Sequence, residues 1–209
     1  GRALAAELDT KGNRAWFLPL DVRSEADWAR VLETVTAQAG RLDVLLCNAG
    51  VNIREPIEQM SEASLDTMLA VNVKGTVLGI KHALPLLRRG GGGTILLTSS
   101  ICGLVGHRYT TEAYVMVKGA LTLLAKAIAV RYAKDNIRCN SVHPSTVETE
   151  QVRELLRDPQ RRAERLAEVP LGRLASVDDV ASAFVYLASD EAAFINGVAF
   201  PVDGGLTAG

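Results

Sequence analysis

Tyr114 and Lys118 stand four positions apart in the segment EAYVMVKGAL. On a helix, residues at this spacing share a face, so the phenol and the ammonium lie one turn apart. A phenol has a pKa of about 10 and is a poor base near neutrality, but a nearby positive charge favours its phenolate form. Lowering that pKa by about three units takes about 4 kcal/mol, and Lys118 supplies part of it. The pair predicts a proton-transferring tyrosine, although an isolated pair of this kind is more often a solvated surface pair.

Two further polar residues stand in apolar surroundings. Ser100 closes the run TILLTSS, where a strand end meets a ligand crevice, and its hydroxyl can donate to a substrate oxygen. Taken alone, a serine at that place is usually a turn residue. Asn72 falls on an apolar stripe of the helical segment 61–89. A buried amide is costly unless it is hydrogen-bonded, so Asn72 either bonds neighbouring backbone or belongs to the site.

Short apolar runs alternate with segments of helical period along the chain, which places these residues in one α/β domain, 1–209. The runs are continuously apolar, as expected for parallel strands with both sheet faces covered. Such alternation predicts a doubly wound parallel sheet. Ser24 and Ser176 are predicted N-caps. The predicted strands are 14–22, 41–50, 93–100, 136–144 and 197–205, and the predicted helices lie near 1–8, 24–39, 61–89, 112–134 and 177–188.

Two prolines constrain the sheet. Pro19 and Pro201 lie inside predicted strands, and proline is tolerated mainly at sheet edges because it has no N–H to donate. The first and the last strand of this chain are therefore predicted to be the two edges.

Composition narrows the class of protein. The 209 residues are 48% hydrophobic and 22% charged with a formal net charge of −1, which predicts a folded core and argues against nucleic acid or an anionic membrane as partner. No apolar run reaches the roughly 18 residues of a membrane span, and no signal peptide is visible, so a cytoplasmic protein is expected. The three widely spaced cysteines, Cys47, Cys102 and Cys139, predict reduced buried thiols and no metal site.

Taken in order, the motifs resemble those of the short-chain dehydrogenases/reductases. They are CNAG at 47–50, AVNVKG around Asn72, TSSICGLVG at 98–106, YVMVK, NIRCNSVHPSTVET at 136–149 and the C-terminal segment that ends in FPVDGG. The resemblance covers essentially the whole chain and implies a Rossmann-like fold of three layers, α/β/α.

The resemblance implies roles for the four polar residues. Tyr114 would be the catalytic acid and base, and Lys118 would lower its pKa and hold the nicotinamide ribose. Ser100 would position the reacting oxygen, and Asn72 would anchor a water that links Lys118 to solvent. The reaction would be hydride transfer between NAD(H) or NADP(H), with NAD slightly favoured, and a small secondary alcohol or ketone.

Cofactor contacts follow from the same resemblance. The acidic end of the first predicted strand would meet the adenine, CNAG the adenosine ribose, and the segment after the fourth predicted strand the carboxamide and pyrophosphate. In this order the residues are Asp21, Val22, Asn48, Ala49, Gly50, Pro144, Val147 and Thr149, with Tyr114 and Lys118 on the nicotinamide side.

The sequence departs from the family pattern at its front. The family opens with a strand, a Gly-rich turn and a helix that receives the pyrophosphate, and no segment of this chain matches. A unit of about 30 to 40 residues with the first two strands is therefore expected to be missing, which leaves strand 14–22 without a neighbour. As given, the chain is expected to bind dinucleotide poorly, and extension upstream to restore binding. A smaller departure is Ser145, where the family often has glycine.

Other segments carry predictions about a lid, pocket contacts and assembly. Residues 150–170 resemble a helical lid, whose arginines are either solvated or meet an anionic substrate. His107 and Glu112 are candidates for pocket contacts, and His143 is predicted to be a loop residue. The helices 61–89 and 112–134 are expected to pair across subunits in a homodimer or homotetramer. The alternatives to an enzyme are a non-catalytic dinucleotide-binding or scaffold relative and an inactive fragment. The lid arginines are Arg153, Arg157, Arg161 and Arg162.

Overall fold

The protein contains a parallel β-sheet of four strands with helices on both faces, as the alternating pattern predicts. It is described by a computed structural model that covers residues 1–10 and 14–209. The strands follow one another across the sheet in the order β1-β2-β3-β4. Their bounds are β1 Val44–Cys47, β2 Gly93–Thr98, β3 Ile137–Pro144 and β4 Ala199–Val202.

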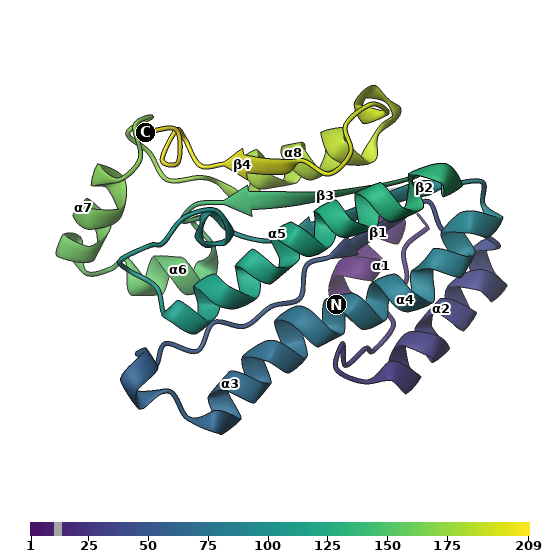
Figure 1. Ribbon diagram of the computed structural model, residues 1–209, viewed down its shortest axis with the longest axis horizontal. Coiled ribbons are helices and arrows are strands. Elements are labelled where there is room, and N and C mark those ends of the chain that lie inside the picture. Colours follow the sequence, from purple (N-terminus) through teal and green to yellow (C-terminus); the bar gives the residue numbers. More distant parts are fainter. Residues whose placement is uncertain (11–13) are drawn as a thin grey trace.

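Helices form the two outer layers (Figure 1). On β2, Ile95 and Leu97 face the cluster that α4 and α5 complete, whereas Leu96 faces α8 on the opposite side. Successive strand residues alternate between faces, so a run that is apolar throughout is buried from both sides. The helices are α1 Arg2–Thr10, α2 Glu25–Ala39, α3 Glu62–Met68, α4 Gly75–Arg89, α5 Glu112–Tyr132, α6 Glu150–Leu155, α7 Pro159–Ala167 and α8 Val177–Ala188.

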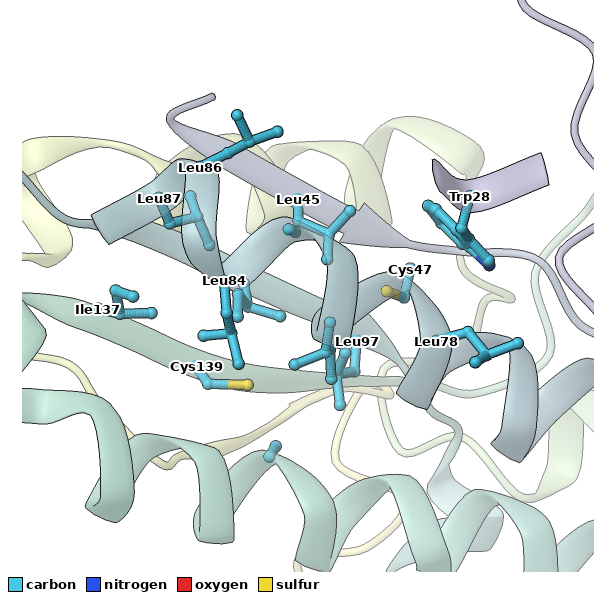
Figure 2. Packing of buried hydrophobic residues seen from close by; sticks show 14 of the residues in the cluster. Trp28, Leu45, Cys47, Leu78, Leu84, Leu86, Leu87, Leu97, Ile137 and Cys139 are labelled. Atoms are coloured by element: carbon cyan, nitrogen blue, oxygen red, sulfur yellow. The ribbon is translucent and has the colours of Figure 1, made fainter. Parts of the chain in front are cut away.

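The largest core cluster lies between the sheet and the helices α2, α4 and α5. Figure 2 shows Trp28 beside Cys47 and Leu78, with the leucines of α4 lying over the strands. A Cβ on Gly79 would meet the Trp28 ring at 2.8 Å, so the glycine lets α2 approach α4 closely. Burying a leucine-sized side chain contributes about 1.5–3 kcal/mol, and this cluster therefore fixes β1 and β2, whose ends carry polar groups.

The predicted strand at 14–22 is wrong. Residues 14–21 of this segment form no strand or helix, and Trp16 and Phe17 are 45% and 43% exposed. A strand exists only through hydrogen bonds to a neighbour. Among the described residues no strand lies beside this segment, so its apolar pattern has nothing to pair with.

The edge prediction is half correct. β4 is an edge and contains Pro201, which pairs in register with His143 of β3. The other edge is β1, not the segment with Pro19, because that segment does not enter the sheet.

The capping predictions are confirmed. The Ser24 hydroxyl accepts from the Asp27 N–H at 3.2 Å, and Ser176 forms a capping box with Asp179 at the start of α8. Gly40 ends α2 in the left-handed conformation that favours glycine, with φ of 75°.

The predicted helix 61–89 is interrupted. A π-helical turn, Leu69–Lys74, separates α3 from α4 and contains Asn72. Turns of this kind insert an extra residue and occur often at functional sites.

One helical stretch, Glu112–Asp135, is long and apolar enough to span a membrane, judged by length and composition alone. The core helix of a folded protein can have the same length and apolar composition. The buried face of α5 includes Val117, Leu121 and Ala125 and packs on the sheet, which gives a physical reason for the apolar composition. The three cysteines are free and buried, as predicted.

Candidate active site

A cavity of about 830 Å³ opens where the strands β1, β2 and β3 end. Asn48 and Gly50 follow β1, Ser100 follows β2, and Pro144 ends β3, and all four line the cavity. The carboxyl ends of parallel strands meet at one edge of the sheet, so residues far apart in sequence converge there.

Tyr114 and Lys118 project from α5 into the same cavity. The Lys118 Nζ lies 5.5 Å from the centroid of the Tyr114 ring, as the i, i+4 spacing predicts. It donates a hydrogen bond of 2.8 Å to the carbonyl of Thr98, and the side chain is buried. The sequence therefore placed the pair correctly, in a cleft and not on a solvated face.

Burial dominates the electrostatics of the pair. It raises the pKa of Tyr114 to about 12 and lowers the pKa of Lys118 to about 8. A side-chain hydrogen bond with Ser100 and the charge of Arg54 act in the opposite direction on the Tyr114 pKa. The expected lowering by Lys118 is not among these effects. Desolvation penalises the phenolate and the ammonium alike, and the ammonium is turned toward the Thr98 carbonyl.

A hydrogen bond to its main-chain carbonyl fixes the position of Ser100. Its carbonyl lies 2.7 Å from the Nδ1 of His143, whose Nε2 lies 2.8 Å from the hydroxyl of Ser141. A carbonyl only accepts, so Nδ1 carries the proton and Nε2 accepts from Ser141. Burial lowers the pKa of His143, which keeps the ring neutral.

His143 was predicted to be a loop residue, and this is wrong. It lies in β3 and is fully buried. The sequence does contain a signal for its role, because Ser141 stands two residues earlier and therefore points to the same face of the strand.

Asn72 bonds the backbone of the loop after β1. Its Oδ1 accepts from the Val51 N–H at 3.3 Å, and its Nδ2 donates to the carbonyls of Val51 at 3.0 Å and Met68 at 2.9 Å. A Cβ on Gly50 would lie 2.8 Å from the Asn72 Oδ1 and 3.4 Å from the Lys118 Nζ. Gly50 therefore separates the amide from the ammonium, and a side chain there would intrude on both.

The predicted cofactor residues fall into two groups. Asn48, Gly50, Pro144, Val147 and Thr149 line the cavity together with Tyr114 and Lys118, whereas the other three are not part of its wall. These three are Asp21, Val22 and Ala49.

The two residues at the end of the first predicted strand are engaged locally. Asp21 pairs with Arg23 at 2.7 Å, and this hydrogen-bonded arginine lowers the Asp21 pKa to about 2. The carbonyl of Val22 accepts from the indole N–H of Trp28 at 3.0 Å. The structure therefore does not bring these two residues to the cavity.

The residues present fit the nicotinamide half of a dinucleotide. The wall carries a lysine, hydroxyl groups and a glycine where a Cβ would obstruct the approach of a ligand to Lys118. Among the residues that line the cavity there is no carboxylate to repel a phosphate. Thr149 caps the short helix α6 by accepting from the Val152 N–H at 3.3 Å.

The predicted pocket contacts and the predicted lid arginines differ in whether they line the cavity. His107 lines the cavity, whereas Glu112 is exposed and does not. The four predicted lid arginines lie outside the wall and are exposed, and three of them pair with carboxylates on the surface. Sequence reasoning missed Arg54 and Arg165, both of which line the cavity.

The parallel sheet with helices on both faces and a cavity at its carboxyl edge define a Rossmann-like fold. The comparisons agree, because a family model described as enoyl-(acyl carrier protein) reductase matches residues 1–207. The chain belongs to the short-chain dehydrogenase/reductase family and is an oxidoreductase.

Named relatives and solved structures support the assignment. The chain is 39% identical over 208 residues to a cyclopentanol dehydrogenase of Comamonas sp. (strain NCIMB 9872), covering 100% of this chain and 83% of the relative. It is 38% identical over 208 residues to 2-(S)-hydroxypropyl-CoM dehydrogenase 3 of Xanthobacter autotrophicus, covering 98% and 81%. A crystal structure of a gluconate 5-dehydrogenase from Burkholderia cenocepacia in complex with NADP and tartrate superposes with a TM-score of 0.94 at 28% identity, covering 99% and 81%. The named relatives are dehydrogenases, and the superposed structure contains NADP.

Proposed function

We propose that the protein transfers a hydride between NAD(H) or NADP(H) and a secondary alcohol or ketone, with Tyr114 as general acid and base. The observation that carries this proposal is the convergence of Ser100, Tyr114 and Lys118 on one cavity wall. Two of these groups have strongly shifted pKa values, which is typical of catalytic sites.

The protein's own groups would handle the proton and the orientation of the substrate. When bound, the nicotinamide ring supplies the hydride chemistry at its C4 atom. In the oxidative direction, the phenolate of Tyr114 accepts the hydroxyl proton of the alcohol. In the reductive direction, its phenol returns a proton to the carbonyl oxygen. Ser100 donates a hydrogen bond to that oxygen in both directions.

Lys118 and Asn72 have supporting roles in this proposal. Lys118 holds the nicotinamide ribose, and Asn72 anchors a water that joins Lys118 to solvent. Gly50 supports the role of Asn72, because glycine has no side chain to fill the space beside the Asn72 amide and the Lys118 ammonium.

The test is oxidation of a panel of small secondary alcohols with NAD and with NADP. We expect Tyr114→Phe to lower kcat by about 10²–10⁴-fold, as expected for removal of a general acid and base. Tyr132→Phe is the matched control, because Tyr132 lies at the far end of α5 beside Arg88. Turnover that survives in Tyr114→Phe would refute the role of the phenol.

A non-catalytic relative is the second candidate. One match at 38% identity over 208 residues carries the name inactive 2-(S)-hydroxypropyl-CoM dehydrogenase 2. The same assay separates the two, since a binding protein would show a dinucleotide titration without turnover.

We also propose self-association through α4 and α5, as a homodimer or homotetramer. The outer face of α5 exposes Met116, Leu123 and Val130, which recur every seven residues and so form one apolar stripe. Free, buried cysteines are compatible with a cytoplasmic location.

A further inference from the structure

The charge of the cavity wall is one-sided. Three cationic side chains line it, Arg54, Lys118 and Arg165, and no aspartate or glutamate does. In the proposed function Lys118 holds the nicotinamide ribose. The two arginines have no role in that function.

Arg165 is fixed in place by packing. Its guanidinium carbon lies 3.7 Å from the centroid of the Tyr109 ring, and His107 packs edge-on to the same ring at 5.7 Å. The side chains of Arg165 and His107 are only 12% and 11% exposed. The cluster of these three residues is therefore a pre-formed part of the wall and not a solvated face.

The polar atoms of this cluster are not satisfied. The Arg165 Nη1 and both ring nitrogens of His107 are buried and have no hydrogen-bond partner among the described residues. Glu168 forms an ion pair with the Arg165 Nη1 at 3.6 Å and lies 3.3 Å from the His107 Nε2, in neither case with hydrogen-bond geometry, and it does not line the cavity. Buried N–H groups of this kind are costly unless a ligand satisfies them.

Arg54 lines the same cavity as this cluster and the reacting groups. Burial lowers the pKa of Arg165 and raises that of Tyr114, and the charge of Arg54 acts to lower both pKa values. No hydrogen bond or ion pair joins Arg54 to the rest of the described chain. Two guanidiniums that repel each other across one cleft favour an anion between them.

We infer that the substrate is a secondary alcohol, or its ketone, that carries a carboxylate-like anionic group, and that Arg165 and Arg54, with His107, bind this group. The guanidinium fork matches the geometry of a carboxylate and discriminates against neutral groups. The inference rests on the proposed function, because it requires the reacting oxygen to lie at Ser100 and Tyr114.

The experiment compares two substrates that differ in the anion alone, 4-hydroxycyclohexanecarboxylate and cyclohexanol. We expect the wild-type kcat/KM to favour the carboxylate by about tenfold or more, the effect of one hydrogen bond to a charged group. Arg165→Gln and Arg54→Gln should each remove most of this preference, because kcat/KM should fall much more for the carboxylate than for cyclohexanol. Arg161→Gln is the matched control, because Arg161 lies on the same helix with a 58% exposed side chain and pairs with Asp158.

Three outcomes would overturn the inference: equal use of both substrates by the wild type, equal loss for both substrates in Arg165→Gln, or a higher KM for the dinucleotide alone. The last would assign the arginines to a cofactor phosphate. Binding of cyclohexanecarboxylate is measured by calorimetry without turnover, with cyclohexylmethanol as the uncharged control. This measurement tests the anion site independently of the proposed function. If neither alcohol is oxidised but the carboxylate binds in an Arg165-dependent manner, the proposed function fails and the anion site stands.

Discussion

The Nδ1 of His143 donates a hydrogen bond of 2.7 Å to the carbonyl oxygen of Ser100. This bond joins β3 to the turn after β2 and places the Ser100 hydroxyl at the cavity wall. Both partners are fixed, His143 by burial and by Ser141, and Ser100 by the short helical turn it caps. In the proposed reaction, His143 would be a positioning residue that acts through Ser100.

Replacing His143 by phenylalanine should leave the Ser141 hydroxyl unpaired and remove one of the two hydrogen bonds to the Ser100 carbonyl, which also accepts from the Gly103 N–H at 2.8 Å. We expect kcat to fall by about 10²-fold, the scale of a small misplacement of a catalytic group, with the KM values for alcohol and dinucleotide little changed. His143→Asn retains a donor near the Nδ1 position and should recover much of the activity. Steady-state kinetics distinguish this from a purely structural role, in which Asn and Phe would be equally impaired.

Alcohol oxidation should depend steeply on pH. Because burial raises the pKa of Tyr114 to about 12, the phenolate that accepts the proton is a minor form near neutrality. Its population rises about tenfold per pH unit, so kcat/KM for oxidation should rise from about pH 7 to about pH 9, while ketone reduction stays nearly flat. A flat oxidation profile in this range would contradict the assignment of the base.

Lys118 should make the stability of the protein depend on pH. Its folded pKa of about 8 lies below the ordinary value of 10.5, so above pH 8 the unfolded chain holds a proton that the folded chain has lost. The unfolding free energy should therefore rise with pH between these values, by up to about 3 kcal/mol, and this contribution is lost as the pH falls through the folded pKa.

The variant Lys118→Met isolates this contribution. Other groups, such as the buried thiols, titrate in both proteins and cancel in the difference between them. Urea unfolding at several pH values gives the comparison. Parallel pH curves for the wild type and Lys118→Met would disprove the shift.

Gly50→Ala should place a methyl group against both the Asn72 amide and the Lys118 ammonium. The added Cβ would lie 2.8 Å from the Asn72 Oδ1, and we expect a loss of about 1–3 kcal/mol of stability together with weaker dinucleotide binding. Gly119→Ala on α5 is the control, because its Cβ meets no atom within 4 Å and alanine is the better helix former. Thermal unfolding should therefore move in opposite directions for the two variants, and a neutral Gly50→Ala would show that the loop yields.

Leu123→Lys tests the apolar stripe on α5. Leu123 is 68% exposed in the single chain, so a charge there should leave the fold intact but prevent burial against a second subunit. We expect a smaller particle by size-exclusion chromatography with light scattering. Leu4→Lys on α1 is the control for an equally exposed leucine at 58%, and an unchanged assembly in Leu123→Lys would exclude this face.

The sequence by itself determined the features that depend on neighbours along the chain. The i, i+4 spacing placed Tyr114 beside Lys118, and the caps of α2 and α8 follow from Ser24 and Ser176. The continuous apolar runs predicted four of the strands and their parallel arrangement. These are local properties of backbone geometry and side-chain period, which residue order encodes directly.

Only the tertiary structure decided the rest. Residues 14–22 have the pattern of a strand but no partner strand among the described residues, and a strand needs one. His143 was predicted to be a loop residue, whereas β3 brings it to Ser100. Arg165 was not among the predicted candidates, and only the fold packs it on Tyr109 at the cavity wall. The sequence predicted a lowered pKa for Tyr114, whereas the folded protein raises it, because burial is an effect of the tertiary structure. Charge proximity can be read from spacing, whereas desolvation depends on all the segments that close around a group.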